Sequence, residues 1–238
     1  MRVLIVQPWF TAIGHPAQSV LNTARALGVR PDVGYLISDP GKGEFAATAS
    51  ELQSYGSVER FHSRGDSLCA GTLFSLPAVL RIARQQTDLH HVFFLDAHLV
   101  ALAAGWPRIA RSAGRVRLVS SVYLGGPEHI TSHVLARAIV SRFLSSSGRR
   151  LFLRTAELQQ AWRDAFPNLP RERIETVPSL ELADDGNIPS PVRDNEEIRF
   201  GVVGQVRPGK GLEWLVPLFA QNSRLGTRFQ NLTLVFKI

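Results

Sequence analysis

The sequence predicts an α/β protein in which a Rossmann-like parallel sheet carries helices on both faces. Short apolar segments such as RVLIVQ and VFFLDA lack polar alternation, which is typical of parallel strands buried on both sides. These segments alternate with stretches whose apolar residues recur at helical spacing. A glycine-containing turn also follows the first strand, and such turns bring backbone amides and a helix N-terminus toward one point.

The sequence begins with a predicted strand, a helix and a second strand. Residues 2–7 form a short apolar run that ends at a proline, as a buried strand does. A helix follows from Pro16, with apolar residues at helical spacing, and Gly28 caps its end. Residues 32–38 predict a second strand, whereas residues 39–70 show no clear pattern.

The alternation continues in the second half of this region. A Ser-rich segment at 145–148 ends one helix, and Thr155 is an N-cap candidate for the next. We expect helices at 73–86, 98–112, 131–144 and 156–166, and strands at 92–97, 116–123, 151–154 and 173–178.

Two domains are expected. Residues 1–183 form the first, and residues 184–197, with prolines, a glycine and several acidic residues, form a linker. Residues 198–238 open a second Rossmann-like domain with a strand, a helix and a strand. Because so few elements cannot bury a core alone, the chain is expected to be a fragment or to be completed by another chain.

Composition narrows the function only a little. The chain has 238 residues, 45% of them hydrophobic, a formal net charge of +7 and one cysteine, Cys69. With no partner for an internal disulfide, no leader segment and no apolar run long enough to span a membrane, we expect a cytoplasmic protein. The basic excess suits a polyanion, nucleotide phosphates or an acidic membrane, or is simply a solvated surface. The arginines are spread from Arg25 to Arg228, so no nucleic-acid partner is expected.

Two glycine turns are candidate anion sites. The segment GQVRPGKG has the glycine and lysine spacing of a nucleotide-triphosphate loop, but Gly211 stands where a hydroxyl should hold magnesium. Arg207 and Lys210 beside backbone amides fit a diphosphate, and an exposed basic turn is the alternative. In the first turn, Gly14 is a lone glycine, which does not meet the dinucleotide fingerprint; it is needed for the turn or touches a ligand.

Beyond these residues, the chain resembles the family 4 glycosyltransferases of the GT-B fold. GQVRPGKGLEWL is similar to the family's donor motif in a variant that resembles GxIRPYKG, with Gln205 at the usual Arg and Gly209 at the usual aromatic. QPWFTAIGHPAQSVLNTARALG resembles the acceptor-side loop and first helix, although His15 stands where a second glycine is common. LFLRTAELQQAWRDAFP and ETVPS are similar to the segments before the domain junction.

The resemblance implies the roles of individual residues. The donor diphosphate would be held without a metal or cofactor by Gly204, Arg207, Lys210 and Gly211, and the acceptor by Gly14 and His15. Where the family often has a histidine, after the strand VRLVSSVY, this chain has Tyr123, with His129 six residues on. Asp96 and His98, at the end of the preceding strand, would face the same cleft if strand ends line it. These four residues are the catalytic candidates, and a surface or core role is the alternative for each.

The function so implied is transfer of a sugar from a nucleotide diphosphate sugar to a glycan or lipid-linked acceptor, with retention, in polysaccharide biosynthesis. The family's Glu-x7-Glu segment lies beyond the end of this chain, so little activity is expected of the chain alone. A non-catalytic nucleotide-sugar-binding subunit or pseudoenzyme is the alternative; a P-loop NTPase is a further one, against which Gly211 argues.

Peripheral attachment to an anionic membrane on its inner face is a separate hypothesis. It rests on the basic excess and on four arginines around the helix 131–144, namely Arg137, Arg142, Arg149 and Arg150. The sequence leaves the sugar, the nucleotide base, the acceptor and the oligomeric state open.

Overall fold

The structure, a computed structural model, describes residues 2–9, 15–39, 45–63, 67–123 and 125–177. The chain divides into two units, Met1–Ala183 and Asp184–Ile238, and all described residues belong to the first. The predicted linker and second domain lie outside the described residues, so these domain bounds stay a prediction.

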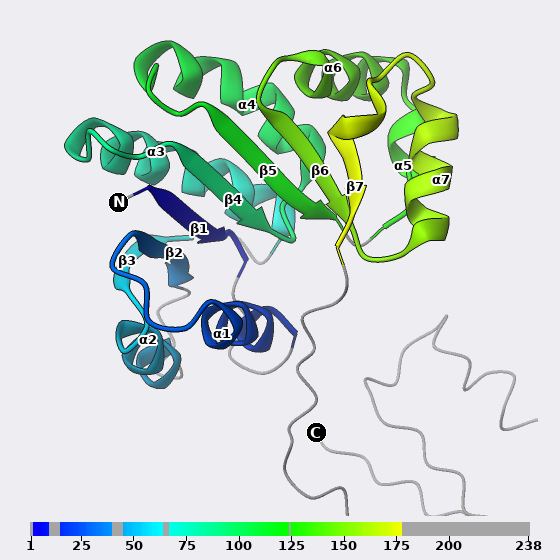
Figure 1. Cartoon of the computed structure of the whole chain (residues 1–238). Helices are drawn as coiled ribbons and strands as arrows, with labels where there is room; N and C mark the ends of the chain where they lie inside the picture. Colours follow the sequence, from blue (N-terminus) through cyan, green and yellow to red (C-terminus); the bar gives the residue numbers. More distant parts are fainter. Residues whose placement is uncertain (1, 10–14, 40–44, 64–66, 124, 178–238) are drawn as a thin grey trace, which may run out of the picture. The chain divides into compact units, whose positions relative to one another are not determined.

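The described part contains one seven-stranded sheet in the order β3-β2-β1-β4-β5-β6-β7, and every neighbouring pair is parallel (Figure 1). The strands are β1 (Val3–Gln7), β2 (Val33–Asp39), β3 (Ser57–His62), β4 (His91–Leu95), β5 (Leu118–Tyr123), β6 (Arg149–Leu153) and β7 (Ile174–Thr176). The predicted fold class, a Rossmann-like parallel sheet, is therefore confirmed.

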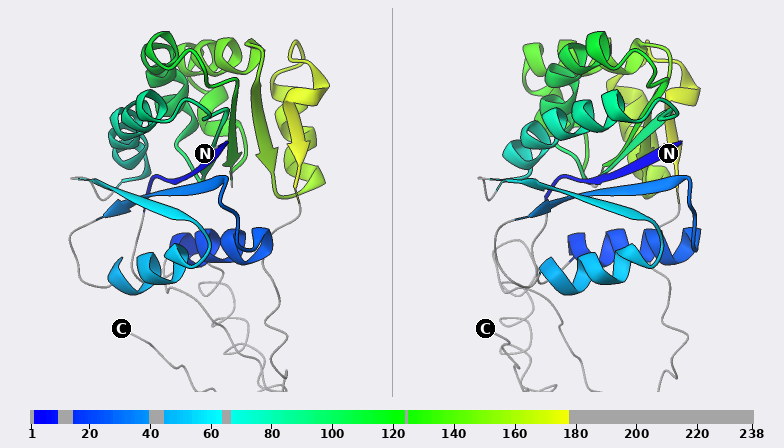
Figure 2. Two further views of the ribbon diagram at one scale, coloured as in Figure 1. Left: turned by 60° about the vertical axis from the view of Figure 1, so that its left-hand side comes forward. Right: turned by 90° about the vertical axis from the view of Figure 1, so that its left-hand side faces the viewer.

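Helices cover both faces of this sheet (Figure 2). They are α1 (His15–Leu27), α2 (Phe45–Gln53), α3 (Leu68–Gln85), α4 (Leu99–Ser112), α5 (Glu128–Thr131), α6 (Val134–Ser145) and α7 (Ala156–Ala165), with a 3-10 turn, η1 (Arg171–Arg173). Alternate strand residues face opposite layers. In β1, Ile5 packs against α1 and α2, whereas Leu4 and Val6 join the larger core with α3, α4, α6 and α7.

Most elements agree with the sequence, and the differences have physical reasons. The segment without a clear pattern contains α2 and β3, and in β3 only Phe61 is buried, so neither apolar alternation nor a continuous apolar run is present. The helix expected at 131–144 is α6, which begins at Val134, and the short helix α5 that precedes it was not expected. Helix α3 begins at Leu68, five residues earlier than expected, because the Ser67 side chain caps it by accepting from the Ala70 amide.

Helix α3 connects β3 to β4 and crosses over the sheet close to the end of β1. It begins directly over the residues that follow β1, and a Cβ atom on Gly71 would overlap the carbonyl oxygen of Pro8. Gly71 is therefore required for this close approach of helix and strand end.

We predict that Gly71→Ala lowers the free energy of unfolding by about 1–3 kcal/mol, because the helix must move away from Pro8 to admit the methyl group. Gly114→Ala is the matched control, since its Cβ meets nothing within 4 Å, and it should change stability by less than about 0.5 kcal/mol. Urea unfolding measures both, and equal stabilities of the two variants would contradict the close packing.

Candidate functional site at the carboxyl edge of the sheet

The carboxyl ends of the strands form the candidate site. From β1 the chain adds strands in one direction, β2 and β3, and from β4 it adds β5, β6 and β7 in the other. The loops after β1 and β4 therefore diverge to opposite faces, and in open parallel sheets ligands bind at this reversal of strand order. The reversal lies between Gln7, at the end of β1, and Leu95, at the end of β4.

Asp96 is the first residue after β4 and has a strained backbone. Its φ of 53° makes it the only residue other than glycine with positive φ among the described residues. Such a conformation costs an L-residue about 1–2 kcal/mol, and strained residues cluster at functional sites. The turn that Asp96 makes leads directly into helix α4.

The carboxylate of Asp96 faces a cation from the end of β6, two strands along the sheet. Arg154, the first residue after β6, places a guanidinium nitrogen 3.6 Å from the Asp96 Oδ1 atom. The side chains are only 21% and 11% exposed, so this pair is more sheltered from solvent than a surface ion pair. Sequence reasoning passed over Arg154, although, like Asp96, it is the first charged residue after a buried strand.

His98 caps helix α4 with its side chain. The Ala101 amide donates to His98 Nδ1 over 3.3 Å, so this ring nitrogen acts as an acceptor. Burial, and secondarily the nearby His129, lower the pKa of His98, so its neutral form is favoured. With Nδ1 accepting, the neutral ring carries its hydrogen on Nε2. His98 is thus suited to donate a hydrogen bond to a ligand and poorly suited to act as a general base.

Thr72 connects this junction to helix α3. The backbone amide of His98 donates to the Thr72 hydroxyl over 2.9 Å, and that hydroxyl donates to the Leu68 carbonyl over 2.8 Å. Thr72 is completely buried. The crossover helix and the β4–α4 turn are therefore joined by a buried hydrogen bond, which holds the His98 backbone in place.

The loop after β5 brings a second histidine to the same edge. Fully buried Trp162 of α7 donates from its Nε1 atom to the Gly125 carbonyl over 3.1 Å and so anchors this loop. His129 lies in α5, is exposed, and is close enough to His98 to lower the pKa of that residue. Tyr123 is the last residue of β5 and pairs in register with Leu153.

The sequence-predicted residues thus divide into two sets. Asp96, His98 and His129 meet at the carboxyl edge, and Tyr123 ends a strand there. His15 is the first residue of α1. The remaining candidates, Gly14, Gly204, Arg207, Lys210 and Gly211, lie outside the described residues, and their roles stay predictions.

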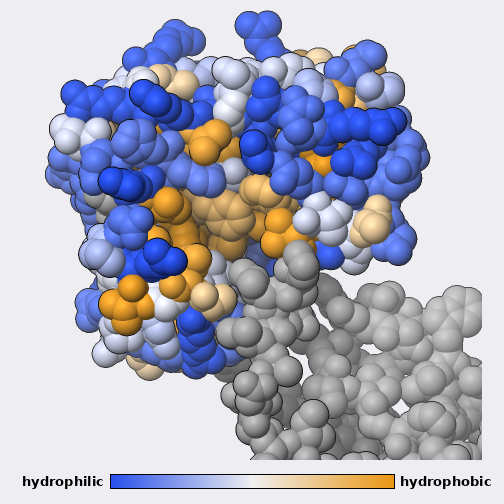
Figure 3. Space-filling model, in the orientation of Figure 1, coloured by the Kyte–Doolittle hydropathy of each residue, from blue (hydrophilic) through white to orange (hydrophobic). Residues whose placement is uncertain are grey.

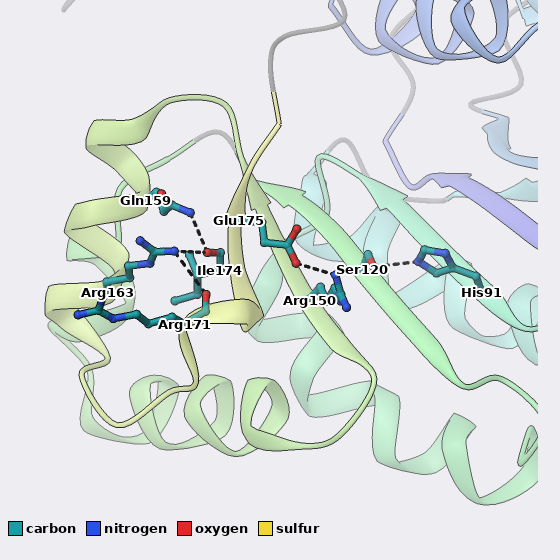
Figure 4. A network of polar contacts seen from close by, with 8 residues as sticks. All are labelled: His91, Ser120, Arg150, Gln159, Arg163, Arg171, Ile174 and Glu175. Atoms are coloured by element: carbon teal, nitrogen blue, oxygen red, sulfur yellow. Dashed lines mark hydrogen bonds and ion pairs between the residues drawn. The ribbon is translucent and has the colours of Figure 1, made fainter.

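A second polar cluster lies on the face of β4 to β7 that α1 and α2 leave uncovered (Figure 4). His91 Nε2 lies 2.8 Å from the Ser120 hydroxyl, a distance that would suit a base and a nucleophile. Ser120, however, is only 1% exposed, and the Glu175 carboxylate accepts from Arg150. Burial, followed by the charge of Arg150, lowers the pKa of His91. The buried hydroxyl of Ser120 is thus satisfied by His91 and is not accessible to a substrate, while Arg150 and Glu175 form a partly exposed ion pair beside it.

Comparison with known proteins gives a fold and no family. No protein-family model matches the chain, and no curated protein matches its sequence. Its fold is similar to that of the UDP-GlcNAc 2-epimerase from Neisseria meningitidis bound to UDP-GlcNAc, with a TM-score of 0.50 and 12% identity over 76% of this chain and 47% of the epimerase. HepE from Anabaena, in complex with UDP, gives a TM-score of 0.47 and 15% identity over 75% of this chain and 44% of HepE. The chain thus spans less than half the length of either protein.

Substitution of Asp96 tests the strained turn. We predict that Asp96→Ala destabilises the protein more than Asp96→Asn does, by about 1 kcal/mol, because asparagine tolerates positive φ better than alanine. Both variants remove the charge that faces Arg154, but asparagine keeps an oxygen that can accept from the guanidinium. Asp96→Gly, which has no such acceptor and adopts positive φ freely, isolates the backbone contribution and should also lose less stability than Asp96→Ala. Denaturant unfolding at neutral pH measures it, and equal losses would contradict the strain.

Acid should destabilise the protein through its two sheltered histidines. The pKa values of His98 and His91 lie below the usual 6.5 in the folded state, so the unfolded chain binds more protons at mildly acidic pH. The stability present above pH 6.5 is therefore lost as the pH falls toward the lowered pKa values. We predict that His98→Asn, which can still cap α4, reduces this loss. Urea midpoints compared at neutral and mildly acidic pH test it, and identical pH profiles of the variant and the parent protein would contradict it.

Proposed function

We propose that this chain is the acceptor-side lobe, together with the opening of the donor lobe, of a retaining glycosyltransferase that uses a nucleotide diphosphate sugar. The observation that carries the proposal is the group formed by Asp96, His98 and Arg154 at the order-reversal edge of a Rossmann-like sheet. The fold is one that a UDP-GlcNAc-binding epimerase shares, which supports a nucleotide-sugar ligand without selecting the reaction.

The chemistry of this group suits a sugar and its phosphate. The Asp96 carboxylate offers acceptors for sugar hydroxyls, while His98 offers an Nε2 donor. Arg154 is a sheltered cation that can bond a phosphate oxygen at two points. The N-terminus of α4 adds a positive helix end beside them. In this proposal Asp96 and His98 touch the transferred sugar, and His129 and Tyr123 are assigned to the same edge of the sheet.

The donor diphosphate is assigned to the loop containing Gly204, Arg207, Lys210 and Gly211, whose amides and two cations stabilise the leaving nucleotide electrostatically and without a metal. The turn at Gly14 and His15 is assigned to the acceptor. The acceptor class is a glycan or a lipid-linked glycan, which the protein would meet in the cytoplasm at the inner face of the membrane.

Binding of nucleotide sugars tests this proposal. We predict that the full chain binds one of UDP-glucose, UDP-N-acetylglucosamine or GDP-mannose in calorimetric titration, and that Arg207→Ala/Lys210→Ala weakens this binding at least about tenfold, because two charge-assisted hydrogen bonds are lost. Arg224→Ala/Arg228→Ala removes the same charge from the same part of the chain outside the motif, and should leave binding unchanged.

The titration separates the alternatives. Binding with sugar transfer to an added acceptor supports the transferase, whereas binding with no transfer indicates a non-catalytic subunit. Magnesium-dependent hydrolysis of ATP or GTP, or the same loss of binding in both double variants, would contradict the proposal.

A further inference from the structure

The net charge of the chain is concentrated in one part of the fold. Basic and acidic residues balance in residues 1–96, and they balance again in residues 178–238. The whole excess of +7 therefore lies between residues 97 and 177, from the start of α4 to the end of β7. In this range the cations are arginines only.

Part of this charge is already used within the fold. Arg154 faces Asp96, and Arg150 forms an ion pair with Glu175 at 2.6 Å. The partly buried guanidinium of Arg149 stacks over the rings of Trp106 and Phe143, so Arg149 and Arg150 both have partners within the fold. The exposed arginines that remain in this range are Arg108, Arg111, Arg115, Arg117, Arg137, Arg142 and Arg171.

The exposed arginines share the amino edge of the sheet, opposite the candidate site. They lie in the last turn of α4 and the loop before β5, in α6 before β6, and in η1 before β7. Figure 1 places α6 and the end of α4 beyond the starting ends of these strands, and Figure 3 shows strongly hydrophilic side chains along the same upper margin. Arg137 donates to the carbonyl of Ala165, the last residue of α7, and so is held at this edge.

Two large apolar side chains project from the same edge. Val134 and Leu135, in the first turn of α6, are 86% and 73% exposed. Among the described residues after residue 97, Leu118 is the other exposed large apolar residue, with an exposed fraction of 37%. It is the first residue of β5 and so also lies at this edge. An apolar pair beside a dense arginine group is unfavourable in water and favourable at a lipid headgroup boundary.

We propose that this amino edge, defined by the seven exposed arginines with Val134 and Leu135, docks on an anionic phospholipid surface. The arginines bind lipid phosphates and carboxylates, and the two apolar side chains enter the headgroup region. A single-stranded nucleic acid would instead need exposed aromatic rings for stacking, and this edge presents aliphatic side chains. Docking here turns the carboxyl edge, with Asp96 and His98, away from the bilayer, so of the two proposed acceptor classes it fits a glycan that extends into solution better than one held at the headgroups.

The inference is independent of the proposed transferase, because it concerns the opposite edge of the sheet. Variants of the amino edge should leave nucleotide-sugar binding unchanged, and variants of the donor loop should leave lipid binding unchanged. Failure of one proposal is thereby distinguishable from failure of the other.

Co-sedimentation of the full chain with vesicles tests the surface. We expect binding to vesicles of phosphatidylcholine with phosphatidylserine, weak binding to phosphatidylcholine alone, and loss of binding as salt is raised. Arg115→Glu/Arg117→Glu should lower the affinity at least about tenfold. Val134→Ser/Leu135→Ser should lower the affinity for these vesicles several-fold and should also abolish the weak binding that remains at high salt.

Matched controls come from the electrically balanced half of the fold. Arg30→Glu/Arg84→Glu makes the same charge change at two exposed positions before β2 and β4, at the same edge of the sheet but outside the group of seven arginines, and Val29→Ser removes a side chain that is 74% exposed. Both proteins should bind vesicles as the parent does, with folding checked by circular dichroism. No binding to the anionic vesicles, an equal loss in the controls, or binding only to polyglutamate or nucleic acid would overturn the proposal.

Discussion

The parallel pairing of β1 with β4 is the constraint on which the rest of the structure depends. It joins two runs of strands that grow in opposite directions, and helix α3 must cross between them. That crossing brings Gly71 against Pro8 and Thr72 against His98, so the loops after both strands are held by one helix. The same pairing sends the helices of the two halves to opposite faces, which leaves the strand ends at the reversal open to a ligand.

The fold could be predicted because parallel strands that are buried on both sides appear in the sequence as apolar runs. β1 and β4 show this, and the helices between them keep helical spacing. Strand β3 was not predicted because it is an edge strand with one buried side chain, Phe61, so burial imposes almost no apolar pattern on its sequence. The short helix α5 was not predicted because its four residues are too few to show helical spacing.

The site could be predicted in part. Asp96 and His98 follow a recognisable strand, and strand ends meet at one edge of any parallel sheet. Their partners could not be found, because Arg154 and Thr72 are distant in sequence and reach the edge only through the strand order. The sequence also suggested His98 as a catalytic group, but the tautomer that its capping bond selects becomes visible only in three dimensions.

The central claim is that the edge between β1 and β4 binds a nucleotide sugar. Mapping of backbone amide chemical shifts during separate titrations with UDP-glucose, UDP-N-acetylglucosamine and GDP-mannose tests it most directly. The account predicts saturable shifts that are largest around Gln7, from Asp96 to Leu99, and near Arg154. Shifts confined to the amino edge of the sheet, or to the His91 and Ser120 face, would contradict it.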